Sequence, residues 1–231
     1  MATRIDVLAE RIESHFADRL SRIESTCGEL TYELSAEHLL QVTTELRDLP
    51  QFKFEQLVDL TGVDYLGFGQ VEWSTQHSTG TGFSRGVARS SQQVDKSTSS
   101  RFAVVYHLLS VANNVRLRLR VRIADNDAPM IDSVVDVWAS ANWFEREAFD
   151  MYGIFFKHHP DLRRILTDYG FIGHPFRKDF PLIGNVEVRY DEVKGRVVYQ
   201  PVSIEPRVLV PRVIREDNRY DAALTQRPAN S

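Results

Sequence analysis

Cysteine is almost absent from this sequence, which has a single one, Cys27, among 231 residues. One thiol excludes a disulfide framework and the usual cysteine-ligated zinc and iron–sulfur sites. Apolar runs are short as well, and none approaches the roughly 18 residues that a membrane-spanning helix needs. The first residues lack the apolar core of a signal peptide. We therefore expect a protein of the reducing cytoplasm.

An excess of positive charge is also missing, because 28 Lys and Arg stand against 32 Asp and Glu. General nucleic-acid-binding proteins are normally basic, so we expect no nucleic-acid partner. The phosphate-loop motif Gly-Lys-Ser/Thr and the hydrolase motif Gly-x-Ser-x-Gly do not occur. The Gly-x-Gly runs at 67–69 and 80–82 lack the later glycine of a dinucleotide-binding fingerprint. The residues by themselves indicate no familiar reaction centre.

The spacing of apolar residues predicts most of the secondary structure. Apolar groups recur every three or four positions over residues 4–25, which predicts an amphipathic helix. A buried strand at 102–111, the turn pair Asn113-Asn114 and strict alternation over 115–123 predict a β-hairpin. We further predict a helix that begins at Ser35 and is ended by Pro50, and a strand from about Asp59. Two more helices are predicted, one from Asp132 or Ser133 through Trp138 and one over 143–152 that is ended by Gly153.

Two segments break this pattern. Of the 27 residues in 74–100, 15 are Ser, Thr or Gly. The segment therefore has too few apolar side chains for their burial to offset the entropy lost when the chain is ordered. We expect a mobile surface insertion there, with the flanking strands paired across it. Prolines recur every five residues from Pro201 to Pro211, which disfavours a helix or a central strand. We expect a body over residues 1–190 and an extended tail over 191–231.

Four arginines share one face of the predicted strand at 115–123, namely Arg116, Arg118, Arg120 and Arg122. Such a face can bind a polyanion or another acidic partner. It can equally be a solvated sheet face with carboxylates on the neighbouring strand, and we favour this second interpretation.

The predicted helix at 143–152 is rich in charge. Arg146 and Asp150 are four residues apart and can meet on one face. Glu147 and Asp150 are also neighbours, which an enzyme hypothesis interprets as a carboxylate pair for acid–base catalysis. We favour a structural salt-bridge cluster that orients this helix against the arginine-rich loop after it, because catalytic carboxylates usually come from separate elements.

The loop after this helix has residues of metal-ligating type, namely His158, His159, His174, Asp161 and Asp168. No two histidines are four residues apart, and the adjacent pair points in opposite directions, so we expect no metal site. Aromatic residues over 138–156 are followed by Arg163, Arg164, Arg177 and Lys178. Aromatics mixed with arginine are typical of interface cores, so this region is a candidate contact surface.

Three runs, at 141–154, 159–171 and 173–182, resemble the C subunit of the bacterial proton-pumping NADH–quinone oxidoreductase, respiratory complex I, the family of the thirty-kilodalton subunit. The signature of that family begins Glu-Arg-Glu, and the matching positions are Glu145, Glu147, Asp150, Met151, Tyr152, His159 and Arg163. The resemblance implies an α+β fold with a small mixed sheet, flanking helices and an extended C-terminal arm. The candidate signature and interface residues are Glu145, Arg146, Glu147, Asp150, His159, Arg163, Arg164, Arg177 and Lys178.

The resemblance also implies a function. The chain would be a structural subunit of the hydrophilic arm, without a catalytic centre of its own, on the cytoplasmic face of the bacterial inner membrane. It would contact the quinone-site D subunit and the cluster-bearing B and I subunits, and would touch the membrane only through the complex. FMN, iron–sulfur clusters and quinone would belong to partner subunits. Two alternatives stay open: the equivalent subunit of a related membrane-bound hydrogenase or formate-hydrogen-lyase complex, and a free-standing enzyme that uses the carboxylate cluster.

Overall fold

The computed structural model describes residues 4–25, 27–68, 73–75, 87–89 and 100–204. The described residues fall into two units, and the first consists of those in 1–66 and 99–185. The second consists of those in 67–98 and 186–231. Most of the predicted insertion at 74–100, and the predicted tail beyond residue 204, lie outside the described residues, so the division into body and tail stays a prediction.

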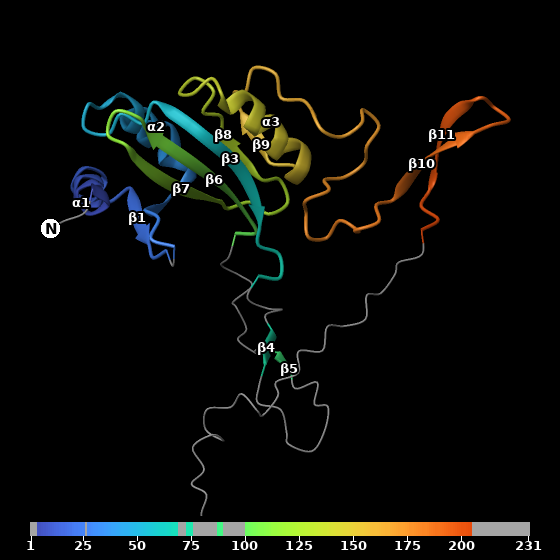
Figure 1. Ribbon diagram of the computed structural model, residues 1–231, viewed down its shortest axis with the longest axis horizontal. Helices are drawn as coiled ribbons and strands as arrows, with labels where there is room; N and C mark the ends of the chain where they lie inside the picture. The colour runs from blue at the N-terminus through green and yellow to red at the C-terminus, as the bar shows by residue number, and fades with distance from the viewer. Residues whose placement is uncertain (1–3, 26, 69–72, 76–86, 90–99, 205–231) are drawn as a thin grey trace, which may run out of the picture. The chain divides into compact units, whose positions relative to one another are not determined.

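The first unit is built on a five-stranded mixed sheet (Figure 1). In spatial order the strands are β1 (Leu20–Ile23), β2 (Thr31–Leu34), β7 (Val115–Ile123), β6 (Phe102–Ser110) and β3 (Gln56–Asp64). Strands β2 and β7 run parallel, whereas the other neighbours are antiparallel. The predicted α+β fold with a small mixed sheet is confirmed.

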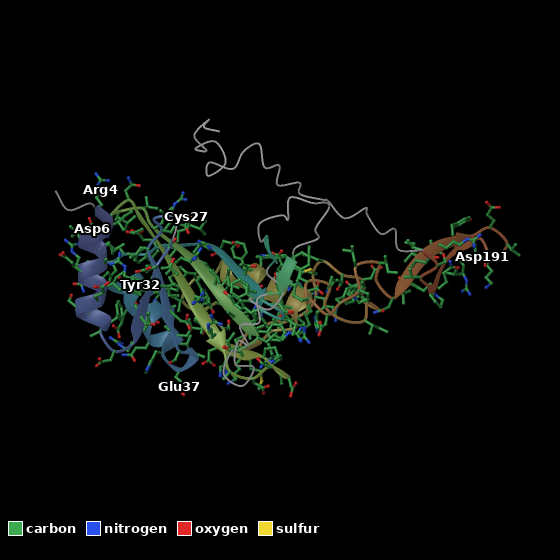
Figure 2. All side chains as sticks on the ribbon, turned by 90° about the horizontal axis from the view of Figure 1, so that it is seen from below. Arg4, Asp6, Cys27, Tyr32, Glu37 and Asp191 are labelled. Atoms are coloured by element: carbon green, nitrogen blue, oxygen red, sulfur yellow. The ribbon has the colours of Figure 1, made fainter. Side chains whose placement is uncertain are left out.

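The rest of the described first unit consists of helices and one small parallel strand pair. These elements are α1 (Arg4–Phe16), the 3₁₀ turn η1 (Ala36–His38), α2 (Leu39–Asp48), β8 (Met130–Asp132), α3 (Ala141–Tyr152) and β9 (Phe155–Lys157). Helix α3 packs against β3, where Gly62 leaves room for the ring of Tyr152. Tyr32 of β2, labelled in Figure 2, ties helix α1 to the sheet. Its hydroxyl donates to the Glu13 carboxylate at 3.1 Å.

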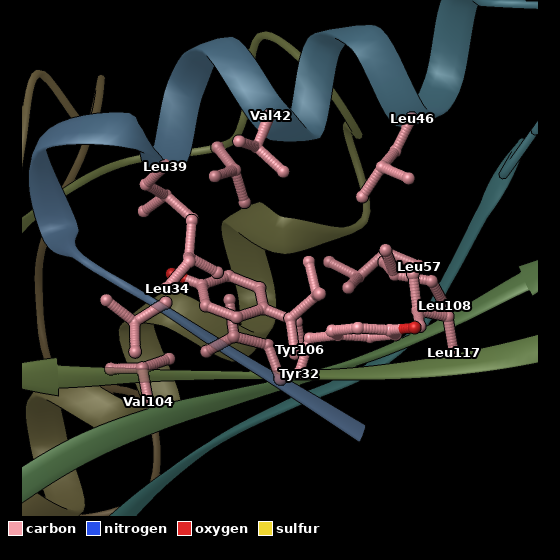
Figure 3. Close-up of a cluster of buried hydrophobic side chains, with 14 of the residues drawn as sticks. Tyr32, Leu34, Leu39, Val42, Leu46, Leu57, Val104, Tyr106, Leu108 and Leu117 are labelled. Carbon is pink, nitrogen blue, oxygen red and sulfur yellow. The ribbon is translucent and has the colours of Figure 1, made fainter. Parts of the chain in front are cut away.

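The core lies between α2 and the sheet (Figure 3). Helix α2 points Leu39, Val42 and Leu46 at the strands, because apolar residues three or four apart share one helix face. The alternation in β6 and β7 turns their apolar residues to the same side, where Tyr106 and Leu108 are fully buried. This single buried face gives the sheet its register.

The predicted hairpin is confirmed as β6 and β7, joined through Asn114, whose φ of 52° suits asparagine in a tight turn. The flanking strands also pair across the insertion as predicted, with Asp64 of β3 opposite Phe102 of β6. Three of the four arginines on the predicted face pair with carboxylates of the neighbouring chain segment. Arg122 and Arg120 both bind Glu33 of β2, and Arg118 binds Glu29 at 3.3 Å.

Two helix predictions are wrong, one in its extent and one altogether. The first helix ends at Phe16 instead of continuing to residue 25, because the Arg19 N–H donates to the Phe16 carbonyl and Leu20 then begins β1. The predicted helix through Trp138 is absent, since Met130–Asp132 is strand β8 and residues 135–137 form a turn. Ser35 precedes η1, but its side chain makes no capping hydrogen bond. Strand β3 begins at Gln56, three residues before the predicted start.

The second unit contains two antiparallel strand pairs among its described residues. They are β4 (Trp73–Thr75) with β5 (Val87–Arg89), and β10 (Val186–Asp191) with β11 (Arg196–Pro201). The predicted boundary between residues 190 and 191 falls inside β10. The first part of the expected extended tail is thus a hairpin, closed at Gly195 with a φ of 58°.

Candidate functional site at helix α3

Helix α3 holds most of the acidic signature, and its faces differ sharply in exposure. Glu145, Arg146 and Asp150 are buried, whereas Glu147 and Trp143 are exposed. The Glu147–Asp150 carboxylate pair of the enzyme hypothesis, which the sequence disfavoured, does not form, because the Glu147 side chain faces solvent and that of Asp150 is enclosed. Arg146 and Asp150 also form no ion pair, since each binds other partners.

Glu145 fixes the chain that precedes α3. Its carboxylate accepts the Ser133 hydroxyl at 2.6 Å and the Val134 N–H at 2.7 Å. Burial raises the pKa of Glu145 to about 7, and these two hydrogen bonds only partly oppose that rise. The protonated form of Glu145 therefore persists to a higher pH than that of an ordinary glutamate. The Glu145 carboxylate thus links α3 to the residues that follow β8.

His159 lies beside Glu145, with its Nε2 4.0 Å from the carboxylate, and both side chains are fully buried. The His159 Nδ1 accepts the N–H of Asp161 at 3.0 Å. A neutral ring then carries its proton on Nε2, which faces the Asn142 carbonyl at 3.3 Å. His159 therefore holds the loop after β9 against the start of α3.

Asp150 organises the next part of that loop. One carboxylate oxygen accepts three successive backbone N–H groups, from Ile165, Leu166 and Thr167, at 3.1, 2.8 and 2.9 Å. The other accepts the Thr167 hydroxyl and Nη1 of Arg164 at 3.3 Å. Burial alone would raise the pKa of Asp150, but these hydrogen bonds outweigh it and the pKa lies below its ordinary value.

The C-terminal end of α3 is capped by residues from far along the loop. Gly153 ends the helix at a φ of 71°, and the predicted stop is confirmed. The His174 ring bonds the Asp150 carbonyl at 2.9 Å, and Arg177 Nε donates to the Tyr152 carbonyl at 2.6 Å. Burial lowers the pKa of His174 and favours its neutral form. Two side chains thus satisfy carbonyls that the helix leaves open.

The end of the loop is tied to the sheet by an enclosed ion pair. Arg101 binds Asp64 through two bonds, of 2.9 and 2.8 Å, and also pairs with Asp179 at 3.0 Å. Asp64 accepts the Lys178 N–H at 2.9 Å as well. The predicted candidate Lys178 contributes its backbone here, and Asp64, a residue of β3, joins the loop to the sheet.

The sequence-predicted residues therefore divide into two groups. Internal anchors are Glu145, Arg146, Asp150, His159, Arg164, Arg177 and the backbone of Lys178. Glu147 and Arg163 lie at the surface, where Arg163 pairs with Asp161 at 2.9 Å. Sequence reasoning missed Asp64, Arg101, Ser133 and Thr167 as parts of the network. No periodic or spacing signal marks these residues, because their partners lie far away in sequence.

The arrangement is suited to holding a loop in place. Within the described residues, no three His, Cys, Asp or Glu side chains are gathered so that they could hold a metal ion. A groove of about 880 Å³ lies elsewhere, over β6 and β7, and is lined in part by His107, Arg116 and Arg118. None of the helices in the described ranges has the length and apolarity required to cross a bilayer.

The loop between residues 163 and 185 also exposes several large apolar side chains. More than half of the surface of each of five of them is accessible: Leu166, Tyr169, Ile172, Phe176 and Leu182. Apolar groups on a loop that is otherwise pinned in place are typical of a contact surface.

Comparisons with known proteins agree on one family. The family described as the respiratory-chain NADH dehydrogenase 30 Kd subunit matches residues 32–186. The C subunit of NADH-quinone oxidoreductase from Halorhodospira halophila is 58% identical over 227 residues, covering 93% of this chain and 92% of that protein. The protein of the same name from Coxiella burnetii is 54% identical over 215 residues, covering 93% and 94%.

A solved structure shows the same fold at low identity. It is a chain of the membrane-bound sulfane sulfur reductase, an archaeal respiratory membrane complex, with a TM-score of 0.51 and 17% identity. The match covers 78% of this chain and 88% of that one. At this identity the likeness speaks for the fold alone.

Proposed function

This chain belongs to the family of the respiratory-chain NADH dehydrogenase 30 Kd subunit, and on that premise we propose that it is a structural subunit of a proton-translocating NADH–quinone oxidoreductase. In this proposal it stands in the hydrophilic arm, at the cytoplasmic face of the inner membrane, against the quinone-site D subunit and the cluster-bearing B and I subunits. It supports electron transfer from NADH to quinone without holding FMN, iron–sulfur clusters or quinone itself.

The use of the ionisable groups supports a structural role. Glu145, Asp150 and His159 are enclosed, and their polar atoms bind groups of this same chain. A general acid or base must reach a substrate atom, directly or through one water. These side chains instead fix the path of the loop over α3, so the chain supplies shape to its neighbours.

The single observation that carries the proposal is the β10–β11 hairpin. Its register places six apolar residues on one face, namely Val186, Val188, Tyr190, Val197, Tyr199 and Pro201. The five of them that are large hydrophobic side chains are each more than half exposed. The other face is polar apart from Val198, and it includes the hydrogen bond between Gln200 and Glu187. A lone two-stranded hairpin is marginally stable in water, so this apolar face needs a covering surface.

Isolation of the tagged full-length chain from membranes tests the proposal. We expect companion polypeptides that together carry FMN and iron–sulfur clusters, detected by flavin fluorescence and electron paramagnetic resonance. Val197→Ser should reduce the companions recovered, because it adds a hydroxyl to the apolar face. Its control, Val198→Ser, makes the same change one residue along on the polar face and should retain them.

Two results would contradict the proposal. One is recovery of the chain without companions, as a soluble protein that turns over a metabolite. The other is a nickel–iron polypeptide in the place of a quinone-site subunit, which would favour the hydrogenase alternative.

A further inference from the structure

Arg146 is a buried cation without an anionic partner in the described part of the chain. Only 7% of its surface is exposed, yet no carboxylate of the described residues lies within 4.0 Å of its guanidinium. The nearby acids are bound elsewhere, since Asp150 pairs with Arg164 and Asp161 pairs with Arg163. Enclosing a charge is costly unless an opposite charge or strong hydrogen bonds compensate it.

The guanidinium is held in one orientation by its own chain. Its Nε donates to the Arg163 carbonyl at 3.1 Å, and the carbon at its centre lies 5.0 Å from the centroid of the Trp143 ring. The fully buried side-chain polar atoms without a partner, among the described residues, are Thr31 Oγ1 and the Tyr106 hydroxyl. The two terminal nitrogens of Arg146 therefore reach the surface, although most of the side chain does not.

These terminal nitrogens form a ready-made fork. A guanidinium presents two parallel N–H donors that match the two oxygens of a carboxylate, and a fork that is already fixed loses little entropy on binding. Trp143 covers one face of the fork and is itself 63% exposed. Tryptophan and arginine are the residues most enriched among those that dominate binding energy at interfaces.

We propose that Arg146 and Trp143 form a receptor for a carboxylate of a partner polypeptide, either an Asp or Glu side chain or a C-terminal carboxylate. The proposal rests on the function proposed above, because it needs the chain to be part of an assembly. Charge complementarity indicates an acidic partner. Arg163 and Arg164 form ion pairs within this chain, whereas the positive charge of Arg146 is left for a group of the partner. Glu147, the next residue, is exposed and makes no ion pair with Arg146 in this structure.

Photocrosslinking in the intact assembly identifies the occupant. Glu147→p-benzoylphenylalanine puts a reactive group beside the fork and keeps Arg146 and Trp143. We expect one companion to be captured, with an acidic residue or its C-terminus in the captured peptide. A captured peptide without any carboxylate side chain or C-terminus would overturn the proposal.

Substitutions then measure the contribution of the fork. Arg146→Gln should lower the amount of that companion retained after a salt wash by at least about ten-fold, since losing one member of an enclosed charge pair is costly. Arg146→Lys keeps the charge but loses the fork and should lie between Gln and wild type. Trp143→Ala should weaken retention in the same direction. Arg116→Gln, a control at an exposed arginine of β7, should change retention less than two-fold.

The partner's carboxylate completes the test. Changing this carboxylate to the amide should lower retention of the companion as much as Arg146→Gln does. Combining the two changes should lower retention no further. Full retention by a folded Arg146→Gln chain would overturn the proposal. If that variant does not fold, Arg146→Lys decides, because retention equal to wild type contradicts a bidentate receptor. Recovery of the wild-type chain without companions would instead refute the proposed function, and this proposal with it.

Discussion

Thr167 binds Asp150 twice, with its backbone N–H at 2.9 Å and its hydroxyl at 2.5 Å from the two carboxylate oxygens. Both carboxylate oxygens of Asp150, the last acid of the signature, therefore accept hydrogen bonds from the loop that follows the helix. This relationship explains how a segment without helix or strand over residues 158–185 holds a defined path. Its shape is set by a few buried polar anchors on α3 and β3.

Asp150→Asn tests the strongest of these anchors. The amide has one acceptor oxygen and would turn N–H groups toward donors, so several hydrogen bonds are lost at a buried position. We expect the free energy of unfolding to fall by about 3 kcal/mol in urea denaturation. Glu147→Gln, on the exposed face of the same helix, should stay within about 0.5 kcal/mol of wild type. Equal effects of the two changes would contradict the anchor role.

Glu145 should make stability depend on pH in the direction opposite to that of most carboxylates. The unfolded chain loses this proton near the ordinary pKa of 4.5, whereas the folded chain keeps it up to about pH 7. Between these values the folded state binds more protons, so rising pH lowers the free energy of unfolding. We expect a loss of roughly 3 kcal/mol across that window and little further change above it.

Glu145→Gln isolates this contribution. The amide cannot ionise, so the difference in unfolding free energy between wild type and variant should shift in favour of the variant from pH 5 to pH 8. Urea denaturation at unit intervals of pH measures it, and contributions of other acids, such as Asp150, largely cancel in the difference. Parallel curves for the two proteins would show that Glu145 ionises normally in the folded state.

The parts of the fold that the sequence predicts well are those determined by local periodicity. Strands β6 and β7 alternate with period two around Asn114, and α3 ends at a glycine with positive φ, as predicted. The predicted helix at 4–25 fails because Leu20 and Ile23 fit the spacing of a helix and of a strand equally well. Their pairing with β2 decides the outcome, and that pairing is not a local property.

The candidate site was predictable in its residue types and not in its geometry. Resemblance singles out Glu145, Arg146 and Asp150 together with Glu147, but it does not tell enclosed side chains from exposed ones. That distinction depends on where the loop runs, and the loop is positioned by long-range bonds such as Lys178 to Asp64. Single-sequence patterns carry no information about pairs more than a hundred residues apart.

Gly153 should tolerate no side chain. Its φ of 71° strains any residue with a Cβ, and a Cβ there would lie 2.6 Å from both Arg177 Nη2 and His174 Nε2. We expect Gly153→Ala to lower the free energy of unfolding by about 2–3 kcal/mol, measured by urea denaturation. Gly170→Ala is the matched control, because it has nothing within 4 Å and should be nearly neutral. A neutral Gly153→Ala would mean that the cap relaxes freely.

The ion pair between Asp64 and Arg101 should control whether the end of the loop stays on the sheet. Removing either partner leaves the other without its two charged hydrogen bonds, and Asp64 is fully enclosed. We expect Asp64→Ala and Arg101→Ala each to destabilise the chain by about 3 kcal/mol, and the double variant to lose less than the sum.

Limited trypsin digestion supplies the local measurement for the same variants. Release of the Lys178 N–H from Asp64 should expose the backbone near Arg177, so cleavage there should accelerate several-fold relative to wild type. Arg118→Ala is a matched control, because it removes a surface pair between β7 and Glu29 and should leave this cleavage unchanged. Cleavage at this position reports local opening. Digestion is therefore measured at a temperature where the sheet remains folded, so that faster cleavage indicates detachment of the loop and not global unfolding.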